Sequence, residues 1–488
     1  MTDQALLLSA LLLPLAGAAG IMLCDRWPNL REAVTLVTAG ALGLIVINIY
    51  LRLQAGAVLA IDLAEPLPGL TLRLEVEPLG MLFALVAGVL WFITSIYAIG
   101  YMRGHHEQNQ TRFYALFAIS IGSAMGVAFA GNLFTLFLWY EVLTISTYPL
   151  VAHAGTPAAR RGARTYVMIL LGTSIGLQLL AILATWSFTG TLDFREGGIL
   201  AGKIDPAWAG LLFALYVFGI GKAAVMPFHL WLPAAMVAPT PVSALLHAVA
   251  VVKAGVFTVL KVTVYIFGTG FITESGAADW LVWFAGATIL FASLVAMTKD
   301  NLKARLAYST VSQLSYIVLG ALLATQASIL GGMLHIAMHA FAKITLFFAA
   351  GAILVAAHKT EISDMAGLGR AMPVTFGAFF VASLSMIGLP PFGGMWSKWY
   401  LALGTLEAGQ WLLLGVLLAS SLLNIAYLLP IPVRAFFGKA RDGTVYTQVR
   451  EAPASCLAAM IVTSLACLVL FFHPEPFYQL ASTIAGAK

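Results

Sequence analysis

Charge is scarce in this sequence. Only 10% of its 488 residues are Asp, Glu, Lys or Arg and 61% are hydrophobic, whereas a soluble domain carries about 25% charged residues. This balance indicates an all-α polytopic membrane protein in contact with lipid. The net charge of +5 does not favour nucleic-acid binding, because the basic residues lie in short loops between apolar segments.

Cysteines and cofactor motifs are equally scarce. The three cysteines, Cys24, Cys456 and Cys467, form no CxxC pair, so they support neither a disulfide framework nor a zinc or iron-sulfur site. The sequence contains no GxGxxG and no P-loop, the usual signs of a bound nucleotide. We therefore expect no cofactor and no metal, and a transporter subunit without catalytic chemistry of its own.

Long apolar runs fill the chain instead. A run of about 20 apolar residues spans a bilayer as a helix. The first run follows Asp3 and has no basic residues before it, which indicates a retained helix and not a cleaved signal peptide. Fourteen spans are predicted, near residues 5–23, 32–51, 79–101, 113–130, 133–152, 166–188, 207–235, 241–266, 279–297, 305–324, 328–357, 373–407, 409–437 and 453–473.

The loops between these runs differ in charge. One set of alternate loops is rich in Lys and Arg, including Arg26, Arg31 and Arg103, whereas the other set has few, including Arg52 and Arg73. Because basic loops stay in the cytoplasm, we expect a bacterial inner-membrane protein with both termini in the periplasm.

A different periodicity follows the second run. Hydrophobic residues alternate with polar ones from Leu70 to Val76. Period two predicts β structure, so we expect a short hairpin on the periplasmic face.

Two apolar runs resemble each other, since each contains a Pro-Phe pair near its middle and a lysine close to that pair. The seventh reads IGKAAVMPFHLW, with Pro227, and the twelfth reads IGLPPFGGMWSKW, with Pro390 and Pro391. A proline inside a helix removes a backbone hydrogen bond, so both helices should be broken. Lys222 precedes the first Pro-Phe pair and Lys398 follows the second, so a simple tandem duplication does not explain them.

Paired broken helices are typical of transporters built from inverted repeats, with ion sites at the breaks. We expect a first five-helix repeat at 113–266 and a second at 279–437. Residues 1–112 would hold three helices and the hairpin, and residues 438–488 the last helix.

Ionisable residues inside the spans are the candidate site. A charged group at bilayer depth costs about 3 kcal/mol, so each one needs a partner or a function. Burial also lowers the proton affinity of a lysine, so that it can lose and regain a proton. Apart from residues at span ends, these groups are Glu141, Lys222, Lys253 and Lys398, and His335, His339 and Lys343 at positions i, i+4 and i+8.

The spacing of the last three places them on one helix face, in a row of roughly 12 Å. Such a row is suited to a proton relay, in which a changing distance between Glu141 and Lys222 would switch proton uptake and release. A fixed ion pair between those two residues is the structural alternative, but it would leave Lys253, Lys343 and Lys398 unexplained. A metal site at His335 and His339 lacks a nearby carboxylate or thiol.

Other polar residues are interpreted more simply. His229 and His247 are either relay members or core histidines. We expect Lys261, near the end of the eighth run, to extend to the membrane interface. His105, His106 and Glu107 lie in a polar loop and should be exposed to solvent.

Five segments carry a family resemblance: WYEVLTISTYPLVAH, MPFHLWLPAAMVAPTPVSALLHAVAVVKAG, LAYSTVSQLSY, HAFAKITLFF and GLPPFGGMWSKWYL. They resemble the antiporter-like proton-channel subunits shared by respiratory complex I, membrane-bound hydrogenases and the Mrp sodium/proton antiporters. The resemblance covers nearly the whole chain and implies fourteen helices, two inverted five-helix repeats and broken helices seven and twelve. By this resemblance, Glu141, Lys222, Lys253 and Lys398 match the family's key charged positions, and His335, His339 and Lys343 match the His and Lys positions of the HAFAK segment.

Within that family two members fit, the D-type subunit of the Mrp antiporters and the proximal subunit of complex I. The segments WYEVLTISTYPLVAH and FGGMWSKWYLALGTLEAG look closer to the D-type subunit. The middle complex I subunit tends to have glutamate where this chain has Lys398, and the distal complex I subunit and the A-type Mrp subunit extend past helix fourteen. The resemblance implies a subunit of a heteromeric membrane complex that moves protons, alone or together with Na+, in exchange for a monovalent cation. The alternative is a proton-pumping subunit of a complex I-like oxidoreductase or membrane-bound hydrogenase.

Overall fold

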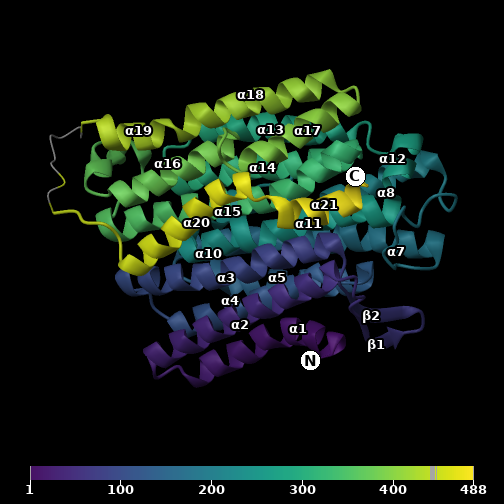
Figure 1. Cartoon of the computed structure of the whole chain (residues 1–488), viewed down its shortest axis with the longest axis horizontal. Coiled ribbons are helices and arrows are strands. Elements are labelled where there is room, and N and C mark those ends of the chain that lie inside the picture. Colours follow the sequence, from purple (N-terminus) through teal and green to yellow (C-terminus); the bar gives the residue numbers. More distant parts are fainter. Residues whose placement is uncertain (1, 440–445, 447, 487–488) are drawn as a thin grey trace.

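The computed structural model describes residues 2–439, 446 and 448–486, and helices form most of this part. Figure 1 shows the helices side by side, with α1 (Asp3–Leu23) and α2 (Pro28–Gln54) at one end of the array and α18 (Trp411–Leu428) and α19 (Pro430–Phe437) at the other. The predicted last region, 438–488, includes residues 440–445, 447 and 487–488, which lie outside the described residues.

The N-terminal part ends with a β-hairpin and a long helix. These elements are β1 (Ala60–Leu67), β2 (Leu70–Glu75) and α3 (Pro78–Gly104).

The next part, up to residue 275, contains the first broken helix. Its elements are α4 (Gln110–Ala128), α5 (Leu133–Val151), α6 (Pro157–Thr173), η1 (Ser174–Gln178), α7 (Leu179–Thr189), α8 (Pro206–Gly219), η2 (Gly221–Ala223), α9 (Trp231–Ala234), η3 (Ala235–Val237), α10 (Thr240–Ala244), η4 (Leu245–Val249), α11 (Val251–Val262), η5 (Thr263–Phe267) and α12 (Thr269–Ser275).

The C-terminal part contains the second broken helix. Besides α18 and α19, its elements are α13 (Leu281–Thr298), α14 (Leu302–Leu323), α15 (Gln326–Ala357), η6 (Ile362–Met365), η7 (Leu368–Arg370), α16 (Pro373–Ile387), α17 (Gly394–Glu407), α20 (Ala454–Phe472) and α21 (Glu475–Ala485).

The described residues form twelve helices that are long and apolar enough to cross a membrane. They correspond to twelve of the predicted spans and make the chain a polytopic membrane protein. The two remaining predicted spans are the interrupted segments, whose helical pieces are all shorter. The total of fourteen spans therefore stays a prediction.

The two helices predicted to be broken, at Pro227 and at Pro391, are interrupted, whereas α1 and α5 continue past Pro14 and Pro149. The first segment leaves helical geometry between Gly219 and Trp231, and the second between Ile387 and Gly394. Gly394 must be glycine, because a Cβ there would lie 1.8 Å from the carbonyl oxygen of Ser385. Each break also contains a cis X-Pro bond, at Pro227 and Pro391.

Side-chain caps fix where several helices begin. Glu77 accepts a hydrogen bond from the Gly80 N–H at the start of α3, and Asn132 accepts one from Thr135 at the start of α5. The hydroxyl of Thr325 forms a capping box at the start of α15. These caps satisfy amide groups that the first helical turn leaves unpaired.

The predicted hairpin is present and is attached to the helices. β1 and β2 pair antiparallel, with Ala60 opposite Glu75. A single bridge joins Leu74 to Ala130 in the α4–α5 connection, and the Glu75 N–H donates to the Phe129 carbonyl at 2.7 Å. The hairpin therefore fixes the position of the loop that precedes α5.

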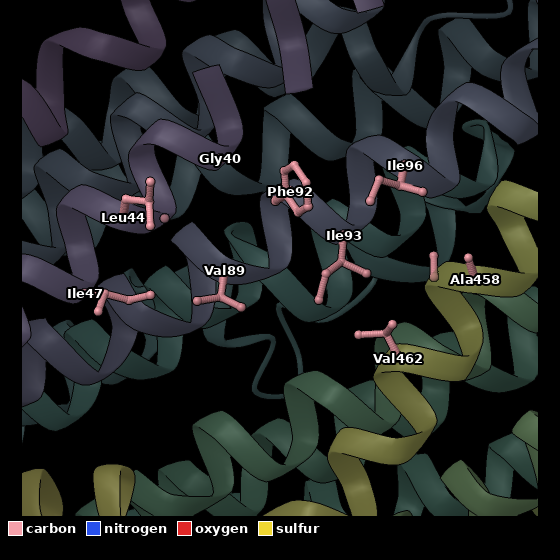
Figure 2. A pocket seen from close by; sticks show the side chains of 11 residues that line it. Gly40, Leu44, Ile47, Val89, Phe92, Ile93, Ile96, Ala458 and Val462 are labelled. Carbon is pink, nitrogen blue, oxygen red and sulfur yellow. The ribbon is translucent and has the colours of Figure 1, made fainter. Parts of the chain in front are cut away.

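Burial identifies the centre of the array. The most apolar part of the α10–α11 segment is completely buried, and α14 is almost as well buried, whereas only 33% of the most apolar part of α2 and of the α18–α19 segment is buried. An apolar groove of about 560 Å³ on the exposed side is lined by α2, α3 and α20, with Leu44, Phe92 and Val462 facing it (Figure 2). The residues that line this groove carry no charged side chains, so the groove does not contain the ionisable groups predicted from the sequence.

Candidate functional site: a row of buried lysines and histidines

Lys222 is completely buried at the first break. It lies on η2, and its Nζ donates hydrogen bonds to the Tyr140 carbonyl at 2.8 Å and to the Thr144 hydroxyl at 2.6 Å. Nζ also lies 3.1 Å from the centre of the Tyr140 ring. Two neutral acceptors and an aromatic ring therefore hold the amine, and within the described residues no bond to a carboxylate fixes its charge.

Glu141 lies between the two residues that hold Lys222. Both of its carboxylate oxygens are buried, and neither has a hydrogen-bond partner among the residues that the structure describes. The close Glu141–Lys222 ion pair that the sequence suggested is therefore not formed in this arrangement. Lys222, on η2, bonds instead to Tyr140 and Thr144, the α5 residues on either side of Glu141, so the fixed-pair alternative lacks its contact.

Lys253 and His339 join the two halves of the chain. Lys253, on α11, is completely buried, and its Nζ lies 2.7 Å from Nδ1 of His339, on α15. A hydrogen bond at this distance needs a lone pair on one nitrogen and a proton on the other. The two groups are thus placed to share a proton.

The row continues from His339 to the second break. The rings of His339 and His335 lie 5.7 Å apart, and Nδ1 of His335 is 2.8 Å from the Ser397 hydroxyl. The next residue, Lys398, donates to the Ile387 carbonyl and to the Ser421 hydroxyl, both at 3.1 Å. Contacts among side chains and chain neighbours thus lead from Lys253 to Lys398.

Tyr316 forms a second connection between His335 and Lys398. Its ring stacks on His335, with the centres 5.7 Å apart, and Nζ of Lys398 lies 5.1 Å from the centre of the Tyr316 ring. The Tyr316 hydroxyl donates to the Leu417 carbonyl at 3.1 Å. A polar aromatic side chain therefore packs beside the histidines.

Lys343 is a branch of the row. It is completely buried one turn beyond His339, and its Nζ donates to the Ser309 hydroxyl at 2.8 Å. Ser309 also accepts a hydrogen bond from Tyr427, which bonds in turn to Asn424. The three predicted α15 positions are all buried, but Lys343 is directed toward α14 and α18.

The other two candidate histidines make fewer polar contacts. His247 is completely buried on η4 against Phe347, with ring centres 4.6 Å apart, and neither ring nitrogen has a partner in the described part of the chain. His229 is half-buried at the first break, with its ring centre 6.1 Å from that of Tyr308. Within the described residues, neither histidine is hydrogen-bonded to the row.

The interpretation of Lys261 as an interfacial lysine is wrong. Its side chain is completely buried, forms an ion pair of 2.9 Å with Glu77 and donates to the Ala130 carbonyl at 2.8 Å. Tyr265 donates to the same carboxylate. No sequence signal pointed to Glu77, which lies at the start of a distant helix, so the partner of the amine was not foreseen.

The polar loop after α3 is also less exposed than expected. His106 is exposed, but His105 and Glu107 are partly buried, and Nδ1 of His105 lies 3.0 Å from the Glu107 carboxylate. Nε2 of His153, in the α5–α6 connection, lies 3.9 Å from the same carboxylate. Burial lowers the pKa of the His153 imidazole, an effect that the nearby Glu107 carboxylate opposes and Arg112 reinforces.

The described residues contain no group of three or more His, Cys, Asp and Glu side chains placed to hold a metal ion. His335 and His339 make their short contacts with a serine and a lysine instead. The arrangement is suited to holding and passing protons among nitrogen and hydroxyl groups in a dry interior.

Comparisons with known proteins identify the family to which this chain belongs. The model of the NADH:quinone oxidoreductase/Mrp antiporter transmembrane family matches residues 130–424, which include every residue of the row. The N subunit of NADH-quinone oxidoreductase from Desulforudis audaxviator is 34% identical over 424 residues, covering 83% of this chain and 82% of the relative. The D subunit of the Na(+)/H(+) antiporter from Alkalihalophilus pseudofirmus is 25% identical over 486 residues, covering 98% and 96%.

A solved structure has the same fold along the whole chain. A chain in the structure of the Mrp complex from Dietzia sp. DQ12-45-1b superposes with a TM-score of 0.88 at 23% identity, covering 100% of this chain and 97% of that one. Both relatives and this solved chain are parts of multisubunit membrane assemblies. The chain belongs to the NADH:quinone oxidoreductase/Mrp antiporter transmembrane family.

Proposed function

We propose that this chain is the proton-translocating subunit of a multisubunit cation/proton antiporter, similar to the Mrp D subunit. The observation that carries the proposal is the buried row from Lys253 through His339 and His335 to Lys398. Such groups are costly in a membrane interior and are retained where ions or protons pass. The similarity to an antiporter D subunit along nearly the whole chain supports the same function.

The row would work as a relay. A proton reaches Glu141 and Lys222 from one side, passes to Lys253 and the two histidines, and leaves by way of Lys398. Because neighbouring cations repel strongly in a dry interior, a proton arriving at one position favours release at the next. Lys343, and His247 and His229 beside the breaks, would adjust the proton affinity of the row.

The two breaks would be equivalent parts of inverted repeats, at 113–266 and 279–437. This proposal is supported by the way each break holds its lysine. Lys222 and Lys398 each donate to one backbone carbonyl and one side-chain hydroxyl. Lys222 comes before its Pro-Phe pair and Lys398 comes after its own, so the two lysines occupy different sequence positions within the two segments.

Coupling would come from neighbouring subunits. Charge movement in a partner would shift the proton affinity of the Glu141 region, and Na+ or another monovalent cation would move in exchange. A charge crossing 100 mV is worth about 2.3 kcal/mol, so modest shifts are enough to set a direction. By the distribution of basic loops, we place the chain in a bacterial inner membrane with both termini in the periplasm.

A second candidate function is that of a proton-pumping subunit in a complex I-like oxidoreductase. It is favoured by the 34% identity to the N subunit of NADH-quinone oxidoreductase, which exceeds the 25% identity to the antiporter D subunit. The row would be the same, but redox chemistry in other subunits would drive it.

Purification of the intact complex through a tag on this chain separates the two. An antiporter is expected to co-purify without redox subunits and to move protons in liposomes when a Na+ gradient is imposed. A complex that oxidises NADH, formate or hydrogen and acidifies one side would establish the second function. A complex that moves no protons under either condition would refute both.

A further inference from the structure

Glu77, Lys261 and Tyr265 form a buried polar cluster that the row described above does not include. The Glu77 carboxylate pairs with Lys261 through Oε1 at 2.9 Å and accepts a hydrogen bond from Tyr265 through Oε2. The same Oε1 accepts a hydrogen bond of 3.1 Å from the Gly80 N–H. Nζ of Lys261 also donates to the Ala130 carbonyl and lies 4.4 Å from the centre of the Phe194 ring.

One side of the cluster is buried and the other is partly exposed. The side chain of Lys261 is completely buried, whereas 17% of the Glu77 side chain is exposed. Glu77 directly follows the hairpin, and the bridge between Leu74 and Ala130 ties the hairpin to the loop whose carbonyl holds Lys261. The carboxylate thus connects a buried amine with the aqueous face on which the hairpin lies.

The buried member of the cluster, Lys261, lies on the same helix as Lys253 of the row. Lys261 follows Lys253 by eight residues on α11, which corresponds to about 12 Å along the helix axis. The buried hydroxyl of Thr258 lies between them on the same helix. That hydroxyl donates to the Ala254 carbonyl, and Nζ of Lys261 lies 5.3 Å from the centre of the Phe257 ring, so ordered water has to bridge the gap between the two amines.

We propose that Glu77, Lys261 and Tyr265 form the outer station of the relay, through which Lys253 exchanges protons with the aqueous face at the hairpin. This inference rests on the proposed function and assigns the site where that function meets water. In the outward direction, the Lys261 ammonium gives a proton to the Glu77 carboxylate, leaving a neutral amine and a neutral carboxyl. The carboxyl releases the proton to water, and the amine takes the next proton from the Lys253 side.

A purely structural role of the Lys261–Glu77 ion pair would require a different property of the basic residue. A clamp between α11 and the start of α3 needs a lasting positive charge, which arginine supplies as well as lysine. A relay needs a group that loses its proton, which arginine does not do in proteins. Lys261→Arg therefore separates the two roles.

The test uses the purified complex in liposomes with a pH-sensitive dye inside, driven by an imposed cation gradient. We expect Lys261→Arg to assemble at the wild-type level and to lose proton flux at least tenfold. Glu77→Gln keeps an oxygen for the Gly80 N–H but loses the titrating group, and it should lose flux to the same extent. Flux within twofold of wild type in an assembled Lys261→Arg complex would overturn the proposal.

Matched controls come from elsewhere in the chain. Lys203→Arg makes the same change at an exposed lysine, and Glu32→Gln removes a buried carboxylate from its ion pair with Arg103. Both controls should keep wild-type flux. If Lys261→Arg fails to assemble, Glu77→Gln decides: normal flux in that variant refutes the outer station.

Lys222→Ala, measured in parallel, separates this inference from the proposed function. Loss of flux in Lys222→Ala together with normal flux in Lys261→Arg would leave the relay in place and reject the outer station. Normal flux in both variants would reject the relay itself.

Discussion

Gly255 of α11 lies directly against the backbone of Lys222. A Cβ at Gly255 would lie 2.3 Å from the Lys222 carbonyl carbon and 2.4 Å from the Ala223 amide nitrogen. The contact fixes the position of η2 along α11 at Gly255, two residues beyond Lys253. Backbone packing thus fixes where the first lysine of the relay stands relative to the second.

Gly255→Ala should therefore displace Lys222. Because the new methyl group meets backbone atoms that cannot rotate away, we expect a destabilisation of about 1–3 kcal/mol. Proton flux should fall in the protein that still assembles. Thermal unfolding of the purified complex and flux in liposomes measure the two effects.

Gly415→Ala is the matched control, since no atom lies within 4 Å of a Cβ at that helical position. It should be neutral or slightly stabilising. Equal stability and flux in Gly255→Ala and Gly415→Ala would show that the close approach to Lys222 has no importance.

Lys222→Ala tests the relay at its first amine. The variant removes the titrating group, while Thr144 and the Tyr140 carbonyl that held it stay in place. We expect assembly at the wild-type level and complete loss of cation-driven proton flux, measured in liposomes. Lys203→Ala, at an exposed position, should have no effect, and normal flux in Lys222→Ala would disprove the proposed route.

Glu141→Gln keeps the shape of the side chain and removes its charge. Since the carboxylate makes no hydrogen bond within the described residues that the amide would break, stability should hardly change. Proton flux should fall at least tenfold, because the charge that acts on the Lys222 region is gone. Glu274→Gln is the exposed control, and unchanged flux in Glu141→Gln would reduce Glu141 to a packing residue.

His153 predicts a dependence of stability on pH. Because burial lowers its pKa in the folded protein, the unfolded chain binds more protons at acidic pH, and stability falls as the pH drops through the unfolded pKa of about 6.5. His153→Phe removes this proton uptake. The variant should lose less stability than wild type between about pH 7.5 and pH 5.5, on either side of that pKa, measured by thermal unfolding of the purified complex.

His106→Phe provides the comparison, since His106 is exposed in the same region of the chain. It should retain the wild-type pH dependence. An equal loss of stability at acidic pH in His153→Phe and wild type would show that the burial of His153 does not govern this behaviour.

Local sequence signals predicted the broken helices and the α15 row well. The missing amide protons of Pro227 and Pro391 favour breaks there, but a proline alone is not sufficient, since α1 and α5 continue past Pro14 and Pro149. The spacing of His335 and His339 fixes a shared face once the helix is given. The short contacts of that face, with Lys253 and Ser397, come from helices distant in sequence and needed the tertiary structure.

The errors have the same origin. Lys261 was expected at the interface because a basic residue near a helix end usually reaches water. In the structure the helix continues into η5, and Glu77 from a distant part of the chain covers the amine. The alternative of a fixed Glu141–Lys222 ion pair, which the sequence had not favoured, also lacks its contact, since neighbouring Tyr140 and Thr144 take the bonds of the lysine.

The unbroken helix α15 has a consequence for how such a machine is controlled. Its 32 residues run without interruption for about 48 Å, longer than the roughly 30 Å thickness of a bilayer core. His335, His339 and Lys343 thus lie on one uninterrupted helix, which fixes the spacing between their backbone positions. A change in the distances from these groups to Lys222 or Lys398 would therefore have to come from the short helical pieces at the two breaks and not from α15.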